Sequence, residues 1–338
     1  MRMRRVGRSG LVVSELCLGT WYFGGPTPYD EALALMRSAL DAGITFWDTS
    51  DHYNAGGSEA TIGRALRELG VREDVILATK AFYPTGPGPN DRGAGRRYLL
   101  RELEAQLKRL QTDWIDIYML HRSDFATPLD ETIETLDACV KAGKIRYWGT
   151  STFPGWRAAE AWWRSELHGW THPICEEAPY NLLDRRVEAD RARFMREYGL
   201  GFFTWSSIAG GLLTGKYAGD ANEAPPDGTR LKDMHRRYQT RLGPATLAKA
   251  QELAALARAA GLDPIHMAVS WVLGQDVVTS ACIGPRSVAQ LGPYVEALDV
   301  KLDRALLDEI DRIVPPGSAY ADFHDTSEWL VGPLSQVG

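Results

Sequence analysis

The sequence is poor in cysteine, in long apolar runs and in positive charge. Its four cysteines show no C-x-x-C spacing, so the sequence indicates neither a zinc site nor a redox pair. The formal net charge of -6 argues against a nucleic-acid or acidic-membrane partner. No apolar stretch has the length of a signal peptide or a transmembrane helix. We therefore expect a cytoplasmic protein that acts on small molecules.

Two nucleotide-binding fingerprints are also absent. There is no G-x-G-x-x-G after the first predicted strand and no Walker-type phosphate loop, which argues against a doubly wound sheet. Hydrophobic residues make up 44% of the chain and charged residues 24%, close to the average for folded soluble proteins. The composition therefore predicts a globular enzyme with a well-packed core.

Short strand-like runs alternate with amphipathic helical stretches along the chain. A hairpin is predicted first, joining Arg4–Val6 to Leu11–Val13. The eight strands predicted after it are Glu15–Leu18, Thr45–Asp48, Asp74–Thr79, Trp114–Leu120, Ile145–Gly149, Pro173–Glu176, Gly201–Thr204 and Thr279–Ile283. Eight strand–helix units predict a closed α/β barrel, the TIM-barrel or (β/α)8 fold.

The segments between the strands support this prediction. Helices long enough to connect parallel strands are predicted over Asp30–Ala42, Glu59–Leu69, Arg97–Leu110, Leu129–Ala142 and Pro154–Leu167. Three further segments have loop character, namely Ala81–Gly95, Ser206–Gly243 and the tail Pro315–Gly338. We expect one domain over residues 1–338, with a barrel core from about residue 14 to 314 and a tail over 315–338.

Ionisable residues follow three consecutive predicted strands. Asp48, Lys80 and His121 stand where apolar runs end, and Tyr53 lies in the loop after Asp48. Because the carboxyl ends of parallel barrel strands share one rim, these four side chains are expected to converge on a pocket. Singly, each has an alternative interpretation as a structural ion pair or a hydrogen-bonded core group.

The four residue types suit the reduction of a carbonyl group. A phenol is a poor acid at neutral pH, and a nearby ammonium such as that of Lys80 lowers its pKa. The carboxylate of Asp48 is expected to keep that lysine charged. His121 can donate a hydrogen bond to a substrate oxygen, while Tyr53 donates the proton.

With these residues the sequence resembles the aldo-keto reductase family, from the hairpin to near Ile313. The matching segments are Leu18-Gly-Thr-Trp21, Gly149-Thr-Ser-Thr152, Tyr180-Asn-Leu-Leu183, Gly210-Gly-Leu-Leu-Thr-Gly-Lys-Tyr217 and Ile283-Gly-Pro-Arg-Ser287. The resemblance implies a barrel that binds NADP(H). It also implies that the family's Asp-Tyr-Lys-His tetrad is Asp48, Tyr53, Lys80 and His121.

The resemblance further implies a set of cofactor contacts. These positions are Gly19, Thr20, Trp21, Asp48, Ser151, Thr152, Glu177, Trp205, Ser206, Gly211, Leu212, Gly215, Lys216, Gly284, Arg286 and Gln290. Ser151 is expected to bind the carboxamide, and Trp205 to lie near the nicotinamide stack. The pyrophosphate is expected at Gly211–Lys216, where glycine amides can approach phosphate closely. Arg286 resembles the residue that contacts the 2′-phosphate, which favours NADPH over NADH.

Four positions depart from the family pattern. Thr152 stands where the family usually has Asn, and Glu177 where it usually has Gln. A carboxylate accepts hydrogen bonds but cannot donate them, so the contacts around the carboxamide are expected to differ. Pro293 and Tyr294 replace acidic and amide residues near the adenine, where binding is expected to be weaker or rearranged.

The sequence leaves the substrate open. A pocket formed by Trp21, Tyr22, Tyr53, Phe82, His121 and Phe153, with the tail around Phe323, is expected to be rich in aromatic rings. Such rings can equally serve as packing groups. Small-molecule carbonyls such as aryl aldehydes, quinones and keto-sugars all remain candidates, and the oligomeric state, homo-oligomers included, is left open.

Two other functions remain open. The D-T-S-D-x-Y segment and Gly210-Gly211 resemble most closely the bacterial and potassium-channel β-subunit-like branches. A protein of that second kind would serve as a cofactor-loaded partner or redox sensor with slow turnover. A metal-dependent barrel hydrolase using Asp48, His52 and His121 is the third hypothesis, but no further ligand stands at convincing spacing, so no metal is expected.

Overall fold

The computed structural model describes residues 1–217, 232, 243–321 and 323. Its centre is a closed barrel in which eight strands follow one another in chain order and β10 pairs with β3. The strands are β3 (Leu16–Gly19), β4 (Phe46–Asp48), β5 (Ile76–Ala81), β6 (Ile115–Leu120), β7 (Ile145–Ser151), β8 (Cys175–Pro179), β9 (Gly201–Trp205) and β10 (Ser280–Ile283). All neighbouring strands are parallel. The predicted (β/α)8 barrel is therefore confirmed.

Some strand boundaries differ from the prediction for local reasons. The strand predicted from Asp74 starts at Ile76, because Arg72–Asp74 forms a single 3-10 turn, η2. Strand β8 runs on to Pro179, where it still pairs with Trp205 of β9. The strands are buried on both faces, as parallel strands covered by helices must be.

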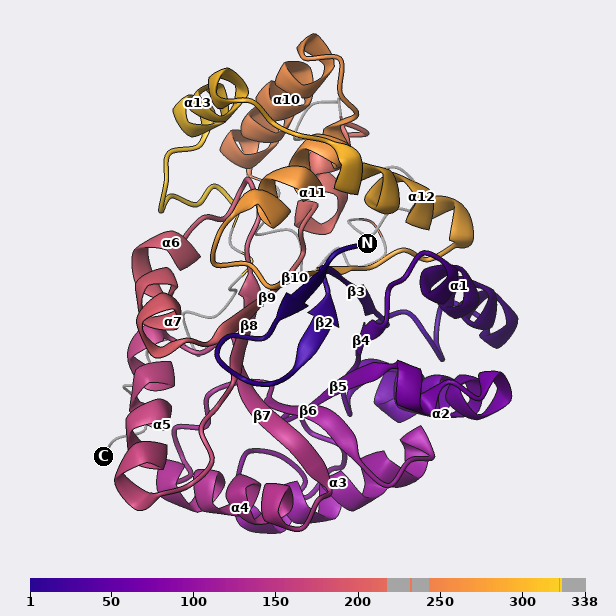
Figure 1. Ribbon diagram of the computed structural model, residues 1–338, viewed down its shortest axis with the longest axis vertical. Helices are drawn as coiled ribbons and strands as arrows, with labels where there is room; N and C mark the ends of the chain where they lie inside the picture. Colours follow the sequence, from indigo (N-terminus) through magenta and orange to yellow (C-terminus); the bar gives the residue numbers. More distant parts are fainter. Residues whose placement is uncertain (218–231, 233–242, 322, 324–338) are drawn as a thin grey trace.

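Helices surround the barrel (Figure 1). The first five are α1 (Tyr29–Asp41), α2 (Gly57–Leu69), α3 (Arg96–Leu110), α4 (Leu129–Lys141) and α5 (Gly155–His168), close to their predicted ranges. The later ones are α6 (Val187–Asp190), α7 (Ala192–Tyr198), α10 (Pro244–Ala259), α11 (Pro264–Gly274), α12 (Val288–Glu296) and α13 (Arg304–Ile313). Short 3-10 segments are η1 (Tyr53–Gly56), η3 (Ala209–Thr214) and η5 (Ala297–Asp299). The main core lies between this helical layer and the strands.

An antiparallel hairpin closes one end of the barrel. Strands β1 (Met3–Arg5) and β2 (Val12–Ser14) pair as the sequence predicted, with Arg4 opposite Val13 (Figure 1). The amide of Arg8 donates to Gly199 O just before β9 begins, so the hairpin covers the amino ends of the strands. Val6 and Val13 pack into the interior cluster of the barrel. This end is therefore sealed, which leaves the carboxyl ends of the strands for a site.

The loops after the strands cover the opposite end. Tyr320 and Ala321, at the start of the tail, donate backbone hydrogen bonds to Leu183 O in the loop after β8. Phe323 follows, with its ring 6.5 Å from that of Trp205. The rest of the tail, and 218–231 and 233–242 of the predicted loop Ser206–Gly243, lie outside the described residues.

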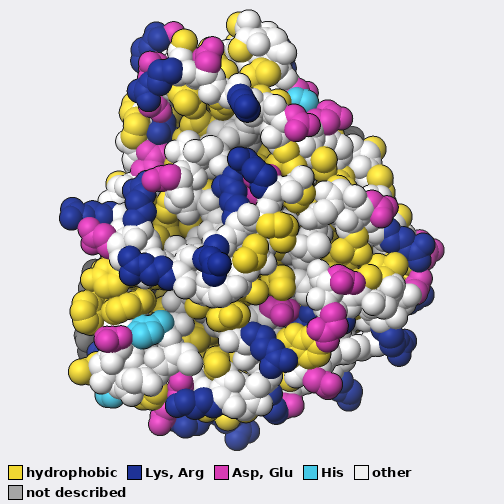
Figure 2. Space-filling view, in the orientation of Figure 1, with side chains coloured by type: hydrophobic (Ala, Val, Ile, Leu, Met, Phe, Trp, Pro, Cys, Tyr) yellow, Lys and Arg dark blue, Asp and Glu magenta, His cyan; other side chains and the backbone are white. Residues whose placement is uncertain are grey.

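The surface at the hairpin end mixes basic and acidic side chains (Figure 2). Hydrophobic side chains gather on the left of this view, over α5 and α7. Among the described helices, none combines the length and the apolar character needed to cross a membrane.

Helices α2 and α3 lie side by side in Figure 1 and approach each other closely at Gly63. A Cβ atom built there would lie 2.3 Å from Arg109 O and 2.6 Å from Leu110 C. Both atoms belong to the backbone of α3, so no side-chain rotation can make room. The absence of a side chain at Gly63 therefore sets the spacing of the two helices.

We predict that Gly63→Ala lowers the free energy of unfolding by about 2 kcal/mol, because overpacking against backbone outweighs the better helix propensity of alanine. Urea denaturation measures the change. Gly274→Ala is the matched control, because a Cβ there meets nothing within 4 Å. An unchanged or increased stability of Gly63→Ala would show that the helices can move apart at little cost.

Candidate active site

The four predicted catalytic residues meet at the carboxyl ends of β4, β5 and β6. Lys80 Nζ lies 2.5 Å from both oxygens of Asp48 and donates to Thr49 O at 3.0 Å. The same nitrogen is 5.3 Å from the centre of the Tyr53 ring. His121 presents its ring edge-on to Tyr53, with 5.9 Å between the ring centres. The strand-end argument thus predicted the convergence correctly.

Residues outside the predicted tetrad complete the surroundings of His121. Ser50 Oγ is 3.0 Å from His121 Nδ1, which fixes the plane of the imidazole. The ring of Tyr83 meets His121 edge-on at 4.8 Å, and that of His52 stacks on it at 5.4 Å. For Ser50 and His52 the sequence signal is the unbroken polar run from Asp48 to Tyr53, of which only the two end residues belong to the predicted tetrad.

Glu177 joins the site from the far side of the barrel. Its Oε2 lies 3.3 Å from Lys80 Nζ, and the side chain is 2% exposed. Apart from this ion pair, no described group hydrogen-bonds to that oxygen. Lys80 therefore lies between two carboxylates, a contact that the sequence did not reveal because β5 and β8 are brought together only by closure of the barrel.

The charges of this cluster are unbalanced, and the pKa values reflect it. Burial and the repulsion of Glu177 raise the pKa of Asp48 to about 7, although Lys80 opposes this shift. Burial alone would lower the pKa of Lys80, but the attraction of Asp48 and Glu177 outweighs it, and that pKa lies well above its ordinary value. In both cases the protonated form is favoured, because the buried cluster contains one more carboxylate than it contains ammonium groups. Lys80 is therefore cationic, as expected.

The pKa of Tyr53 shifts the opposite way from our expectation. Burial raises it far above the ordinary value, and the lowering by Lys80 is too small to compensate. That prediction rested on the charge of Lys80 and left out the cost of burying a phenolate away from water. Tyr53 therefore keeps its proton in the unliganded protein.

The predicted nicotinamide side lies directly beside the tetrad. Thr20 donates to Asp48 O through its amide, at 3.1 Å, and its hydroxyl, at 2.8 Å. Trp21 stacks on Tyr53 with 5.9 Å between ring centres. Gly19 packs so tightly that a Cβ would lie 2.7 Å from Cys282 Sγ. These three residues form one wall of the catalytic pocket.

The two predicted phosphate-binding positions lie near each other. A Cβ at Gly211 would lie 3.3 Å from Lys216 Nζ, so the lysine side chain folds over this glycine. Burial and the charge of Arg286 lower the pKa of Lys216, which places the two cations within electrostatic reach. The guanidinium of Arg286 also covers the ring of Tyr22 at 5.1 Å. Gln290 accepts a hydrogen bond from the Arg286 amide at 2.9 Å.

The remaining predicted contacts occupy loops and strand ends around this region. Ser151 ends β7 opposite Glu177, and the Thr152 amide donates to Glu177 O at 2.7 Å. Trp205 ends β9 and Leu212 is buried in η3. Gly215 accepts a hydrogen bond from Arg258, and Gly284 has open space where a Cβ would lie. Of the two unusual adenine-side residues, Pro293 lies inside α12 and Tyr294 is buried in the core.

Backbone strain concentrates in the loops of this site. Within the described part of the chain, six non-glycine residues have positive φ, and five of them lie in loops after β4, β7 and β9, namely Asn54, Ala55, Thr152, Ser206 and Ala209. A β-branched residue such as Thr152, at φ 54°, is a genuine outlier. Strain of this kind persists where the surrounding structure holds a functional geometry.

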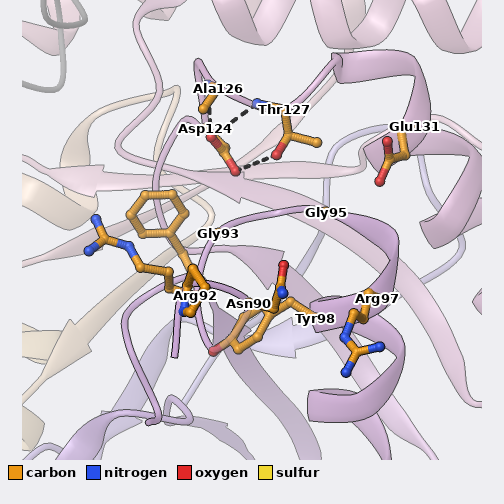
Figure 3. A pocket seen from close by; sticks show the side chains of 12 residues that line it. Asn90, Arg92, Gly93, Gly95, Arg97, Tyr98, Asp124, Ala126, Thr127 and Glu131 are labelled. Atoms are coloured by element: carbon orange, nitrogen blue, oxygen red, sulfur yellow. Dashed lines mark hydrogen bonds between the residues drawn. The ribbon is translucent and has the colours of Figure 1, made fainter. Parts of the chain in front are cut away.

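Two predicted substrate-pocket residues lie elsewhere in the structure. Phe153 is buried in the main core, and Phe82 lines a cavity of about 360 Å³ between the loops after β5 and β6 (Figure 3). Asp124, Arg92, Tyr98 and Glu131 also line this cavity. The residue next to Phe82, Tyr83, contacts His121. Their roles toward a substrate stay predictions.

Two groups of side chains are close enough together to hold a metal ion, but both groups already make other contacts. Among the described residues, Asp51, His52 and His121 could hold an ion, and so could Asp48, Glu177 and Cys282. Asp51 accepts hydrogen bonds from Tyr98 and Ser50, and Lys80 lies between the carboxylates of the second group. An ion at either place would have to displace these partners.

Comparisons with known proteins agree with this geometry. The sequence model of the aldo/keto reductase family matches residues 15–315. The chain belongs to the aldo/keto reductase family. It is 38% identical over 327 residues to the "Uncharacterized oxidoreductase YrpG" of Bacillus subtilis (strain 168), across 94% of this chain and 97% of that protein.

Other relatives of this chain are described as potassium channel subunits. It is 36% identical over 320 residues to a "Probable voltage-gated potassium channel subunit beta" of Oryza sativa subsp. japonica, across 93% of this chain and 97% of that one. A protein of the same description from Arabidopsis thaliana is 33% identical over 320 residues, across 93% of this chain and 97% of that one. The predicted family is therefore confirmed, and with it a reductase-type oxidoreductase barrel.

Asp51 provides a test of the site's electrostatics. Burial and the charge of Glu59 raise its pKa to about 7, against an ordinary value of 3.8. A carboxyl group whose pKa is higher in the folded state stabilises the fold below the ordinary pKa, and this contribution is lost as the pH rises toward 7.

We predict that Asp51→Asn abolishes this loss of stability with rising pH. The free energy of unfolding of the variant, relative to the wild type, should rise by a few kcal/mol between pH 4 and pH 8, at about 1.4 kcal/mol per pKa unit. Urea denaturation across this pH range measures the difference. Two parallel stability curves would show that Asp51 titrates alike in the folded and unfolded states.

Thr152→Asn tests the strain in the loop after β7. Asparagine tolerates positive φ far better than a β-branched residue, and its side chain can still accept from Arg122, which donates to Thr152 Oγ1 at 3.3 Å. We predict a gain of about 1 kcal/mol in the free energy of unfolding of the protein without cofactor. A loss of stability in thermal or urea denaturation would contradict the assignment of strain.

Proposed function

We propose that this aldo/keto reductase reduces an aldehyde or ketone with NADPH, in a reversible reaction in which Tyr53 donates the proton. The observation that carries this proposal is the buried Lys80 ammonium, 1% exposed, held by Asp48 beside the Tyr53 phenol. When bound, the reduced nicotinamide would supply the hydride. The geometry supports a proton donor at Tyr53 because a cation lies close to where its phenolate would form.

The residues around the site suit an NADP(H) molecule. The buried Glu177 Oε2 beside Ser151 and Thr152 has a lone pair for a carboxamide N–H. Gly210 and Gly211, at φ 64° and 102°, hold the backbone in a conformation that can turn amides toward phosphate. Lys216 and Arg286 supply positive charge near one another, and a guanidinium is suited to a 2′-phosphate.

The residues of the site would have the following roles in this reaction. Asp48 keeps Lys80 charged, and Lys80 stabilises the phenolate that Tyr53 leaves after giving up its proton. His121, oriented by Ser50, would donate a hydrogen bond to the substrate oxygen. Trp21, stacked on Tyr53, would exclude water from that side of the pocket.

A second function is supported by the relatives described as potassium channel β subunits. A protein of that kind would bind cofactor and a partner protein and turn over slowly. The exposed side chains Trp156, Trp163 and Leu167 share one face of α5 and offer an apolar surface for such a partner. Tight NADPH binding without turnover on any carbonyl would favour this function.

Tyr53→Phe tests the proposed mechanism. We predict that kcat/KM for NADPH-dependent reduction falls by about a thousandfold, because a general acid contributes 10²- to 10⁴-fold, while NADPH binds with nearly unchanged affinity. Aryl aldehydes, quinones and keto-sugars serve as substrates in an assay of NADPH oxidation. Tyr198→Phe is the control, because that hydroxyl lies on α7 and contacts Trp163. Equal loss of turnover and of binding in Tyr53→Phe would refute the role of the phenol.

A further inference from the structure

Glu177 gives the catalytic lysine a second negative partner. Asp48 binds the Lys80 ammonium through both oxygens at 2.5 Å, so this ion pair is complete without Glu177. The additional carboxylate belongs to the middle residue of β8 and lies 3.3 Å from Nζ. One ammonium therefore faces two carboxylates in a region where all three side chains are buried.

Three other titratable side chains in the described part of the chain pack around this cluster, and none of the three supplies the missing positive charge. Burial raises the pKa of Tyr53, so the phenol is neutral. The hydrogen bond with Cys17 lowers the pKa of Cys282, but burial and the nearby carboxylates outweigh it, so that thiol is neutral as well. Burial also raises the pKa of Cys17. The cluster thus has one negative charge in excess when both carboxylates are ionised.

The position of Glu177 connects this excess charge to the cofactor pocket. Glu177 is the register partner of Ser151 on β7, and its carbonyl accepts the Thr152 amide. Its Oε2 lies 3.3 Å from Lys80 Nζ and accepts no hydrogen bond from any described residue, so the hydrogen-bonding capacity of this buried carboxylate is not used. A buried and incompletely paired carboxylate favours a cation or an N–H donor as its neighbour.

The two redox forms of a nicotinamide differ in this respect. The oxidised ring is a pyridinium cation, whereas the reduced dihydropyridine ring is neutral. Both forms carry the same carboxamide, so a neutral hydrogen-bonding side chain at position 177 would distinguish them only weakly. A negative charge in a poorly solvated pocket distinguishes them by Coulomb attraction.

We propose that the Glu177 carboxylate makes the protein bind NADP⁺ more tightly than NADPH and so makes the bound reduced ring a stronger hydride donor, which favours reduction of the carbonyl within the bound complex. This inference rests on the proposed function. It specifies how the site biases the equilibrium between the two bound redox forms, which neither the fold nor the tetrad determines. Glu177 acts as a specificity-determining residue, since it selects the redox form of the bound ring without a part in proton transfer.

The test is an equilibrium titration of the wild-type protein and of Glu177→Gln with NADP⁺ and with NADPH, followed by tryptophan fluorescence. We expect the wild type to have the lower Kd for NADP⁺. Glu177→Gln should shift the ratio of the two Kd values about tenfold toward NADPH, because a unit charge is removed from a site of low effective dielectric constant. Such a shift corresponds to about 30 mV in the potential of the bound two-electron couple. The titration is made at pH 8, since the pKa of Asp48 is about 7.

Glu177→Asp is the matched control, because it retains the charge and alters the side-chain length. It should keep most of the wild-type preference for NADP⁺. Equal Kd values for the two nucleotides in the wild type, or the same shift in the Asp and Gln variants, would overturn the inference while leaving the proposed function intact. Failure of the wild type to bind either nucleotide would overturn both.

Discussion

The structure of this site depends on the buried ion pair between Lys80 and Asp48. An ammonium in a poorly solvated strand end would lose its proton, and a lone carboxylate there would take one up. Together they form a fixed charge whose two members come from adjacent strands, β4 and β5, with Lys80 also anchored to Thr49 O. Tyr53, Glu177 and Cys282 are arranged around this pair, and its charges act on the phenol and the thiol in addition to burial.

The barrel supplies the rigidity that such a pair requires. The hairpin seals the amino ends of the strands and lets Val6 and Val13 fill the interior, so the lower half of the barrel is a well-packed apolar core. Polar side chains are thereby confined to the upper rim, where the loops follow. The same loops contain the strained residues Thr152, Ser206 and Ala209, whose cost of order 1 kcal/mol or more each must be balanced by the packing below.

The residues that meet at the strand ends could be predicted from the sequence, whereas the contacts across the barrel could not. Asp48, Lys80 and His121 could be placed together because each ends an apolar run, and parallel strands share one rim. The ion pair of Glu177 with Lys80 joins β8 to β5, and nothing in the local pattern of either strand indicates which residues face each other inside a closed barrel.

The sequence predicted a lowered pKa for Tyr53, and the raised pKa found instead has the largest consequence for the proposed mechanism. A phenol with a lowered pKa would be a better acid, but in the resting protein it would also lose its proton more readily. Burial keeps the proton on Tyr53 before substrate arrives. In the proposed reaction, proton transfer would remain favourable, because an alkoxide formed by hydride addition is a stronger base than a phenolate, even one that is poorly solvated. Lys80 would then matter most after the transfer, when it would pair with the new phenolate and prevent the return of the proton. The pair of Lys80 and Asp48 therefore need not activate the resting phenol. It stabilises the charge that appears during the reaction.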